Sequence, residues 1–256
     1  MSTEQEIIIR VENLTVAYDE TVIIDNISFD VHKGEVFVIL GGSGCGKSTL
    51  LKQMIGLYAP ASGRILIGGD DIVSAEGSDR LRILRKIGVM YQSGALFGSM
   101  TLFENVRLPL EEFTNLNSSA MDLIVLMKLK QVGLKGFENH MPSELSGGMQ
   151  KRAAIARAMV LDPQILFLDE PSAGLDPITS AELDQLIISL ARNLRITFVI
   201  VTHELPSIYS IADRVIMLDK RVRKIVADGR PQELRDKSDN QSVRQFFKRE
   251  VTANAL

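Results

Sequence analysis

The sequence predicts an α/β fold built on a mostly parallel β-sheet with helices on both faces. Short apolar segments with the length of buried strands, at residues 36–40, 165–168 and 197–201, recur along the chain with helical segments between them. Parallel strands need such crossover connections, so this alternation favours a parallel sheet. Residues 93–160 lack strand-like runs and show helical periodicity, which predicts a helical insertion into the sheet domain. A composition of 45% hydrophobic and 24% charged residues is typical of a globular protein with a substantial core.

Charge and cysteine content argue against several classes of protein. The net charge of −3 lacks the strong basic excess of a nucleic-acid-binding protein, so we expect no nucleic-acid partner. A single cysteine, Cys45, cannot form a disulfide within the chain, which favours a reducing compartment. The polar N-terminus does not resemble a signal peptide, and no apolar run approaches the roughly 18 to 20 residues of a membrane span. We therefore expect a chain that does not cross a membrane by itself.

The expected elements begin with two antiparallel strands rich in β-branched residues, at 7–11 and 23–31. The run at 36–40 is continuously apolar and ends in glycines, which indicates a buried parallel strand leading into a Gly-rich loop. The further elements expected before the middle of the chain are a helix from Leu50 onwards and strands at 64–68 and 87–91.

The helical insertion contains recognisable helix boundaries. Thr101 and Glu104 have the spacing of a capping box, in which hydroxyl and carboxylate satisfy each other's backbone N–H groups. Residues 118–132 show a second helix pattern, which ends at Gly133. A third helix is expected at 147–160. The apolar face of the second helix is expected to comprise Leu123, Leu126, Leu129 and Val132.

Strands return after the insertion, and the tail from Asp236 differs in character. Ser242 can cap a short helix whose apolar stripe either packs on its own domain or docks a partner subunit. That stripe comprises Val243, Phe246, Phe247 and Val251. The returning elements are strands at 165–168, 197–201 and 215–218, with a helix at 180–192. The expected division is a core in two parts (1–92 and 161–235), a helical subdomain (93–160) and a tail (236–256).

A phosphate-binding loop is expected where the strand at 36–40 meets the next helix. Residues 41–48 fit the pattern GxxxxGK[ST] in the strand–loop–helix context that this motif requires, so a plain Gly-rich turn is the weaker interpretation. Glycines let backbone N–H groups converge on phosphates, and the helix N-terminus adds a positive dipole end. Lys47 should reach the β- and γ-phosphates of ATP, and the Ser48 hydroxyl should bind Mg²⁺. The expected nucleotide-binding residues here are Gly41, Gly42, Ser43, Gly44, Cys45 (a tolerated spacer), Gly46, Lys47, Ser48 and Thr49.

Candidate catalytic residues follow later strands. Asp169 and Glu170 end an apolar strand: Asp169 should hold Mg²⁺ directly or through water, and Glu170 should orient or deprotonate the attacking water. His203 follows another strand and can reach the γ-phosphate and Glu170 from the same edge of the sheet. Gln92 also ends a strand, where its amide can reach Mg²⁺ or water. Taken singly, these residues have plainer interpretations as turn acids, a structural histidine and a loop glutamine.

A second anion site is expected where residues 145–149 open a helix. Ser146 can serve as its N-cap, and the free N–H groups and the dipole of the first turn favour an anion. One ATP has a single triphosphate, which the first loop already surrounds, so the second site makes sense if it contacts another subunit's ATP. This argument predicts a head-to-tail homodimer. The residues concerned are Ser146, Gly147, Gly148 and Met149.

These motifs, in this order and over nearly the whole chain, resemble the ABC ATPase family. The resemblance implies a P-loop NTPase (RecA-like) core with an antiparallel β subdomain, an inserted α-helical subdomain and transport-coupled ATP hydrolysis. Tyr18 stands where that family stacks an aromatic ring on adenine. Asp176 stands in its D-loop, where it would help couple the two sites of the dimer. Met149 departs from the glutamine that most of the family has, while Ser146 and both glycines remain.

Within the family, the chain resembles the Mla-type ATPases, which power MCE-type lipid trafficking in bacterial envelopes. This resemblance implies a peripheral protein on the cytoplasmic face of the bacterial inner membrane. The implied partners are MlaE-like permease subunits, an MCE-domain protein and a possible small regulatory subunit. The alternatives are a lipoprotein-release exporter, an amino-acid importer, and a non-transport ABC ATPase or nucleotide-sensing module. The segments that carry the resemblance are 92–97, 141–149, 176–179, 211–213 and 243–246.

Three other features have plain interpretations. The basic cluster at residues 220–224 is expected in a solvated hairpin rather than at a membrane surface. His32 and His140 are expected at the protein surface.

Overall fold

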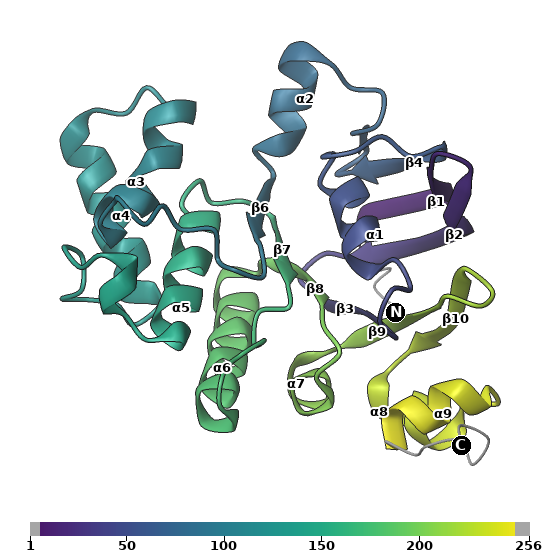
Figure 1. The fold of residues 1–256 in the computed structure, drawn as a ribbon. Helices are drawn as coiled ribbons and strands as arrows, with labels where there is room; N and C mark the ends of the chain where they lie inside the picture. The colour runs from purple at the N-terminus through teal and green to yellow at the C-terminus, as the bar shows by residue number, and fades with distance from the viewer. Residues whose placement is uncertain (1–5, 249–256) are drawn as a thin grey trace, which may run out of the picture.

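The computed structural model describes residues 6–248, which form two β-sheets surrounded by helices (Figure 1). The larger sheet has six strands in the order β10-β9-β3-β8-β7-β6. All of them run parallel except β10, which pairs antiparallel at one edge, so the predicted mostly parallel sheet is confirmed. The strands are β3 (Val36–Gly41), β6 (Ile87–Met90), β7 (Ile165–Asp169), β8 (Thr197–Val201), β9 (Arg214–Asp219) and β10 (Lys224–Gly229).

The smaller sheet has four antiparallel strands in the order β2-β1-β4-β5. Its first two strands are the expected antiparallel pair, but both are longer than predicted. Register shifts interrupt β1, and Asn13 within it has a positive φ of 48°, so the alternation visible in the sequence stops before the strand does. The strands are β1 (Ile7–Tyr18), β2 (Thr21–His32), β4 (Ser62–Ile67) and β5 (Asp70–Asp71).

Helices pack on both faces of the larger sheet and form a separate group beside it. Figure 1 shows α3, α4 and α5 together on the side of β6, away from the smaller sheet. Residues 93–160 contain helices and no strand, as predicted. Within the part of the chain that the structure describes, no helix is long and apolar enough to cross a membrane. The helices are α1 (Lys47–Met54), α2 (Gly77–Leu84), α3 (Leu102–Phe113), α4 (Ser118–Gln131), the 3-10 turn η1 (Pro142–Glu144), α5 (Gly147–Ala158), α6 (Pro177–Leu194), α7 (Leu205–Ile211), α8 (Pro231–Lys237) and α9 (Gln241–Lys248).

The larger sheet separates two apolar cores, because successive side chains of a strand point to opposite faces. Val38 and Leu40 of β3 lie in a core shared with the helical insertion, α6 and α7. Phe37 and Ile39 of the same strand lie in a core shared with α1 and the smaller sheet. The continuous apolar run in the sequence therefore reflects a strand buried on both faces.

The helical insertion confirms one expected boundary and corrects one expected face. The Thr101 hydroxyl accepts a hydrogen bond from the Glu104 N–H, and the Glu104 carboxylate accepts one from the Thr101 N–H, so the capping box is present. In α4, however, Leu123 is 70% exposed and Leu126 is 42% exposed. The residues that α4 and its C-cap bury are Met121, Val125, Lys128, Leu129 and Val132. The prediction was right for Leu129 and Val132 and wrong for Leu123 and Leu126, because α4 is apolar on two faces and the sequence does not show which of them meets the core.

The tail helix α9 forms, but its cap differs from the one expected. The side-chain oxygen of Asn240 accepts hydrogen bonds from the N–H groups of Ser242 and Val243, so Asn240 takes the place predicted for Ser242. Val243 and Phe247 are buried in the core, and the Phe247 ring lies 6.0 Å from that of Tyr209 on α7. These two residues therefore pack on their own chain. Val251, the last member of the expected stripe, lies outside the described residues.

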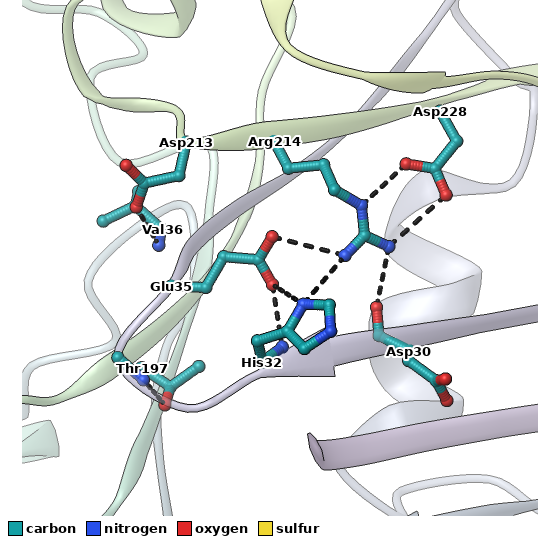
Figure 2. Close-up of polar contacts among 9 residues, drawn as sticks. Asp30, His32, Glu35, Val36, Thr197, Asp213, Arg214 and Asp228 are labelled. Carbon is teal, nitrogen blue, oxygen red and sulfur yellow. Dashed lines mark hydrogen bonds and ion pairs between the residues drawn. The ribbon is translucent and has the colours of Figure 1, made fainter. Parts of the chain in front are cut away.

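A cluster of polar groups around Arg214 joins the two sheets (Figure 2). The Arg214 guanidinium on β9 donates to the carboxylate of Asp228 on β10 (2.7 Å), to that of Glu35 before β3 (3.3 Å) and to the carbonyl of Asp30 on β2 (2.9 Å). It also lies 4.9 Å above the ring of Phe37.

Both histidines expected at the surface are half-buried instead. His32 places its Nδ1 3.4 Å from Arg214 and also 3.4 Å from the Glu35 carboxylate, so it belongs to this polar cluster. The His140 ring lies 5.1 Å from the ring of Phe137, at an angle of 52° to it. The basic residues at 220–224 do lie in the exposed β9–β10 hairpin, as expected.

Candidate nucleotide-binding site

The phosphate-binding loop connects β3 to α1 in the backbone conformation that its glycines permit. Gly41 and Gly46 have φ values of 149° and 99°, which disfavour residues with a side chain. A Cβ on Gly41 would lie 2.5 Å from the Leu218 carbonyl oxygen and 2.6 Å from the Cys45 sulfur. Gly46 is the N-cap of α1 and has no side chain to bond the first N–H groups of the helix. The loop therefore presents backbone donors and a helix N-terminus to an anion.

The side chains that follow the loop connect α1 to the end of β7. The Lys47 ammonium donates to the carbonyls of Gly41 (2.9 Å) and Gly42 (3.3 Å), so it lies against the loop. The Ser48 hydroxyl donates to a carboxylate oxygen of Asp169 at 3.3 Å. Burial raises the pKa of Asp169 above its usual value, and the charge of Glu170 adds to the effect, while the Ser48 hydrogen bond opposes it. A cation at this position would favour the charged carboxylate.

Glu170 and His203 are in direct contact, as the sequence led us to expect. The Glu170 carboxylate oxygen Oε1 lies 2.8 Å from His203 Nδ1. Glu170 has a positive φ of 48°, and its N–H donates to the Val201 carbonyl of β8. Its second oxygen, Oε2, is buried without a hydrogen-bond partner among the described residues. Buried carboxylate oxygens are normally hydrogen-bonded, so this atom is available to a water molecule or ligand.

The remaining candidates lie around this edge of the sheet. Gln92 is exposed two positions after the end of β6, whose neighbour is β7, and it therefore lies near the carboxyl ends of these parallel strands. Tyr18 ends β1 and is 46% exposed. The smaller sheet reaches the phosphate loop through β2, since a Cβ on Gly46 would lie 3.0 Å from Ile23 and 3.1 Å from Ile24.

The second expected anion site lies at the start of α5. Ser146 is the N-cap, and its hydroxyl accepts a hydrogen bond from the Met149 N–H at 3.3 Å. Gly148 packs against α6, because a Cβ there would lie 2.3 Å from a methyl carbon of Thr179. Among the described residues, no hydrogen bond links residues 146–149 to residues 41–49 of the same chain. The two anion sites are thus built on separate elements.

Asp176, the expected D-loop residue, is the N-cap of α6. Its carboxylate accepts hydrogen bonds from the N–H groups of Ile178 (3.0 Å) and Thr179 (3.1 Å). The Thr179 hydroxyl also donates to it at 2.5 Å. The Thr179 bonds lower the pKa of Asp176, so the residue stays ionised at the surface.

Two buried charged residues near the site were not predicted. Lys151 on α5 is only 8% exposed, and its ammonium donates to the Gln92 carbonyl. Asp184 on α6 is 5% exposed, and burial raises its pKa to about 6, although a hydrogen bond from Ser207 opposes the shift. Ser207 belongs to α7, the helix that follows His203, and its hydroxyl also lies 3.5 Å from that of Ser180. Nothing local in the sequence distinguishes these two charges from the exposed charges around them.

Comparison with known proteins identifies the family. The profile described as ABC transporter matches residues 24–173. The chain is 45% identical over 226 residues to the intermembrane phospholipid transport ATP-binding protein MlaF of Escherichia coli K12, covering 88% of this chain and 82% of that protein. The chain belongs to the ABC transporter family. It is the ATP-binding and ATP-hydrolysing subunit of a transporter of this family.

Of two further relatives, one has the same transport name and the other has a different one. The MlaF protein of Haemophilus influenzae is 41% identical over 243 residues, which cover 95% of this chain and 91% of that protein. The probable ribonucleotide transport ATP-binding protein mkl of Mycobacterium leprae is 44% identical over 239 residues. That match covers 93% of this chain and 68% of the mycobacterial protein, so the chain spans about two thirds of that relative.

Solved structures of the family confirm the predicted fold. A dimeric ATP-binding cassette in a post-hydrolysis state, bound to ADP and phosphate, superposes with a TM-score of 0.78 at 30% identity. The match covers 87% of this chain and 98% of the solved chain. A cassette of a Clostridium perfringens ABC transporter complex gives a TM-score of 0.84 at 30% identity, covering 96% and 100% of the two chains. The chain therefore has the ABC ATPase fold that the motifs implied.

Proposed function

We propose that this ATPase powers the transport of phospholipid between membranes of a bacterial envelope. The observation that carries the proposal is the 41% and 45% identity to two proteins named for intermembrane phospholipid transport, each matched over most of its length. The mycobacterial relative, named for ribonucleotide transport, is equally similar but is matched over only 68% of its length. Ribonucleotide transport is therefore the second candidate function.

In this proposal, the phosphate loop binds ATP, and the residues around the loop orient the nucleotide. The loop N–H groups and Lys47 hold the phosphates, and Tyr18 stacks on the adenine ring. The positive φ angles of Gly41 and Gly46 support this assignment, because such a backbone lets successive N–H groups converge on an anion.

We assign Mg²⁺ to the position between Ser48 and Asp169. Their oxygens lie 3.3 Å apart, both are hard donors of the kind that Mg²⁺ prefers, and burial disfavours the charged Asp169 unless a cation is near. Gln92 would supply a further amide oxygen from the end of β6. When bound, the ion would stabilise the charge that develops on the phosphate oxygens.

Glu170 acts as the base that orients or deprotonates the attacking water, and His203 holds it. The 2.8 Å contact fixes Oε1 and leaves Oε2 buried and free to accept a bond from water. His203 would also hydrogen-bond the γ-phosphate and so join the base to the reacting group.

The working unit would be a head-to-tail homodimer. The signature residues 146–149 cap a helix that does not bond its own phosphate loop, and a partner's ATP would complete the second anion site. Asp176 lies at the adjacent helix start and would couple the two sites. ATP would then favour the closed state, since only that state contacts both faces of the nucleotide.

We place the chain on the cytoplasmic face of the inner membrane, bound to MlaE-like permease subunits. Residues 92–97 would form the docking surface, where Phe97 is 49% exposed. An MCE-domain protein and a small regulatory subunit would complete the assembly. In this scheme residues 1–92 and 161–235 bind nucleotide, residues 93–160 move with the permease, and residues 236–256 form an accessory tail.

Affinity purification from detergent-solubilised native membranes tests this proposal. We expect a multi-span permease and an MCE-domain protein to co-purify with the chain, and phospholipid to be found by mass spectrometry. The complex, reconstituted into vesicles, should move fluorescent phospholipid only with ATP, and the Glu170→Gln complex should not. Recovery of a different permease, with transport of ribonucleotide in the same vesicles, would overturn the phospholipid assignment while leaving the ATPase intact.

A further inference from the structure

The segment after β6 is held to the helical insertion by side chains from two helices. Arg157 on α5 donates to the carbonyls of Ala95 (2.7 Å) and Gly94 (2.9 Å). Asn105 on α3 is fully buried; it accepts from the Phe97 N–H at 2.8 Å and donates to three carbonyls, including that of Phe97 at 3.1 Å. The segment from Gly94 onwards is thus fixed to the insertion rather than to the sheet.

Lys151 extends this attachment to Gln92, the residue nearest the sheet. It lies on α5 five positions after the N-cap Ser146, is only 8% exposed, and donates to the Gln92 carbonyl. One ammonium group therefore bonds the Gln92 backbone, while the helix that carries it begins at the signature residues 146–149.

We infer that Lys151 is a positioning residue that links two parts of one chain. The first part is the signature, residues 146–149, which would contact the partner's ATP, and the second is Gln92, beside the chain's own ATP. The inference rests on the proposed roles of Gln92, Glu170 and residues 146–149. A displacement of α5, whose first turn would contact the partner's ATP, moves the Lys151 ammonium and with it the Gln92 backbone beside the chain's own ATP. The link is direct, because a single side chain spans from the signature helix to the end of β6.

The charge of Lys151 makes the link specific. A buried donor without an acceptor is costly, so Lys151 favours the arrangement in which the Gln92 carbonyl is within hydrogen-bonding reach. A neutral side chain of similar length would fill the same space without that preference.

The first test measures steady-state ATPase kinetics of the full chain in its complex. We expect Lys151→Met to lower kcat about tenfold or more, because a small misplacement of a positioned group is costly, while nucleotide affinity stays within about twofold. Lys151→Arg, which keeps a cationic donor, should recover most of the rate. The control is Arg152→Met, which removes the neighbouring cation on α5; Arg152 bonds the Val132 carbonyl and Glu182 instead, so kcat should stay near the wild-type value.

The second test asks whether Lys151 acts through Gln92. In the Gln92→Ala background, Lys151→Met should cause little additional loss of kcat, because the group that it positions is already gone. Hydrogen exchange of residues 92–97 should speed up in Lys151→Met and stay unchanged in Arg152→Met. If the losses multiply in the double variant, or if Lys151→Met keeps both the wild-type kcat and the wild-type exchange, the inference is overturned.

Failure of this inference can be told apart from failure of the proposed site. If Lys151→Met does not fold, Lys151→Leu replaces it in the same cycle, since it also removes the donor and fills part of the same space. A Glu170→Gln variant that hydrolyses ATP normally would remove the site assignment itself. An inactive Glu170→Gln variant beside a fully active Lys151→Met variant would remove only the link.

Discussion

Two adjacent carboxylates at the end of β7 have different hydrogen-bond partners. Asp169 bonds a hydroxyl from the phosphate loop helix, whereas Glu170 contacts His203 and keeps one buried oxygen without a bond. The left-handed backbone at Glu170 turns its side chain away from the direction that a regular strand would give it. This difference supports the proposed roles, in which Asp169 binds a cation and Glu170 binds water.

The first prediction separates catalysis from binding at these residues. Glu170→Gln should lower the ATP turnover rate by at least about a hundredfold, because an amide cannot accept the proton. ATP should still bind, and the ATP-bound dimer should accumulate. Lys47→Ala should instead lose ATP binding. Phosphate release, equilibrium titration with a fluorescent nucleotide and size-exclusion chromatography check the three outcomes. Normal turnover in Glu170→Gln, or unchanged nucleotide affinity in Lys47→Ala, would refute the corresponding role.

The second prediction concerns the buried Asp184. Its folded-state pKa of about 6 lies above its ordinary value of 3.8, so the charged form destabilises the fold above pH 6, and this cost disappears as the pH falls towards 4. Asp184→Asn carries no charge at any pH. It should therefore be more stable than the wild type at pH 8, by about 3 kcal/mol at most, and no more stable at pH 4.

Thermal unfolding of the two proteins between pH 4 and pH 8 measures that difference. Glu182→Gln is the matched control, since Glu182 lies on the same helix with its side chain 61% exposed, and its unfolding midpoint should follow the wild type at every pH. A stability difference for Asp184→Asn that does not change with pH would contradict the prediction.

The sequence predicted single residues well where a motif confines their backbone. Residues 41–48 can be recognised because the chemistry needs a glycine at fixed positions, and the two acids follow an apolar strand whose end is visible. Lys151 and Asp184 could not be found in this way. Their importance comes from burial, which depends on how α5 and α6 pack, and a lysine or aspartate on a helix is exposed far more often than not.

At the scale of elements, the start of α5 packs directly on the start of α6. Gly148 has no side chain, and the Thr179 methyl occupies the space beside it. The same Thr179 donates its hydroxyl to Asp176, so its side chain cannot rotate away without losing that bond. The signature and the D-loop helix are thus in contact through one glycine and one threonine.

The third prediction tests this contact with a compensating pair. Gly148→Ala should destabilise the protein by about 1 to 3 kcal/mol, because the new Cβ overlaps the Thr179 methyl. Thr179→Ser removes that methyl and keeps the hydroxyl, so the double variant should recover most of the loss. Urea-induced unfolding measures both.

The control for this pair is Gly147→Ala. Its Cβ would meet Leu175 at 3.4 Å, an ordinary contact, so little stability should be lost. Equal stability of Gly148→Ala and the wild type, or a double variant no better than the single one, would show that the overlap relaxes by another route.

Helices and strands were predicted most reliably where the hydrophobic pattern of the sequence fits only one structure. β3 and β8 are apolar at nearly every position and are buried on both faces, so their existence and ends were clear. α4 is different, because its own leucines and methionines lie on two of its faces, and the sequence does not show which face packs on the core. The cap of α9 was misplaced by two residues, since Asn240 and Ser242 are both good caps and only the fold shows where the helix begins.

At the scale of the whole molecule, Arg214 connects the sheet that carries the catalytic strands to the smaller sheet. Its guanidinium contacts groups on β2, β10 and the start of β3 (Figure 2). The cluster lies at the opposite ends of the parallel strands from the phosphate loop, because Glu35 precedes β3 and the loop follows it. Its contribution is therefore to the relative placement of the sheets and not to the chemistry.

The fourth prediction follows from that placement. Arg214→Met should lower the free energy of unfolding by about 2 to 4 kcal/mol, because it leaves the poorly exposed Glu35 carboxylate without its cation. ATP affinity per folded molecule should remain normal. Urea-induced unfolding and nucleotide titration check the two statements. Arg10→Met is the control, since the Arg10–Asp30 pair is exposed and should contribute less than about 1 kcal/mol.

The insertion point of the helical lobe has a consequence for how such proteins diversify. β6 and β7, which precede and follow the lobe, are paired neighbours: Met90 lies beside Leu168 although 78 positions separate them in the chain. Because the two strands are parallel, the insertion leaves the sheet at the carboxyl end of β6 and returns at the amino end of β7, where Ile165 lies beside Ile87. Both connections are thus made to neighbouring strands, and a change in the length of the insertion leaves the order of the strands unaltered. Lineages can therefore vary this module to suit new partners while keeping the same hydrolytic core.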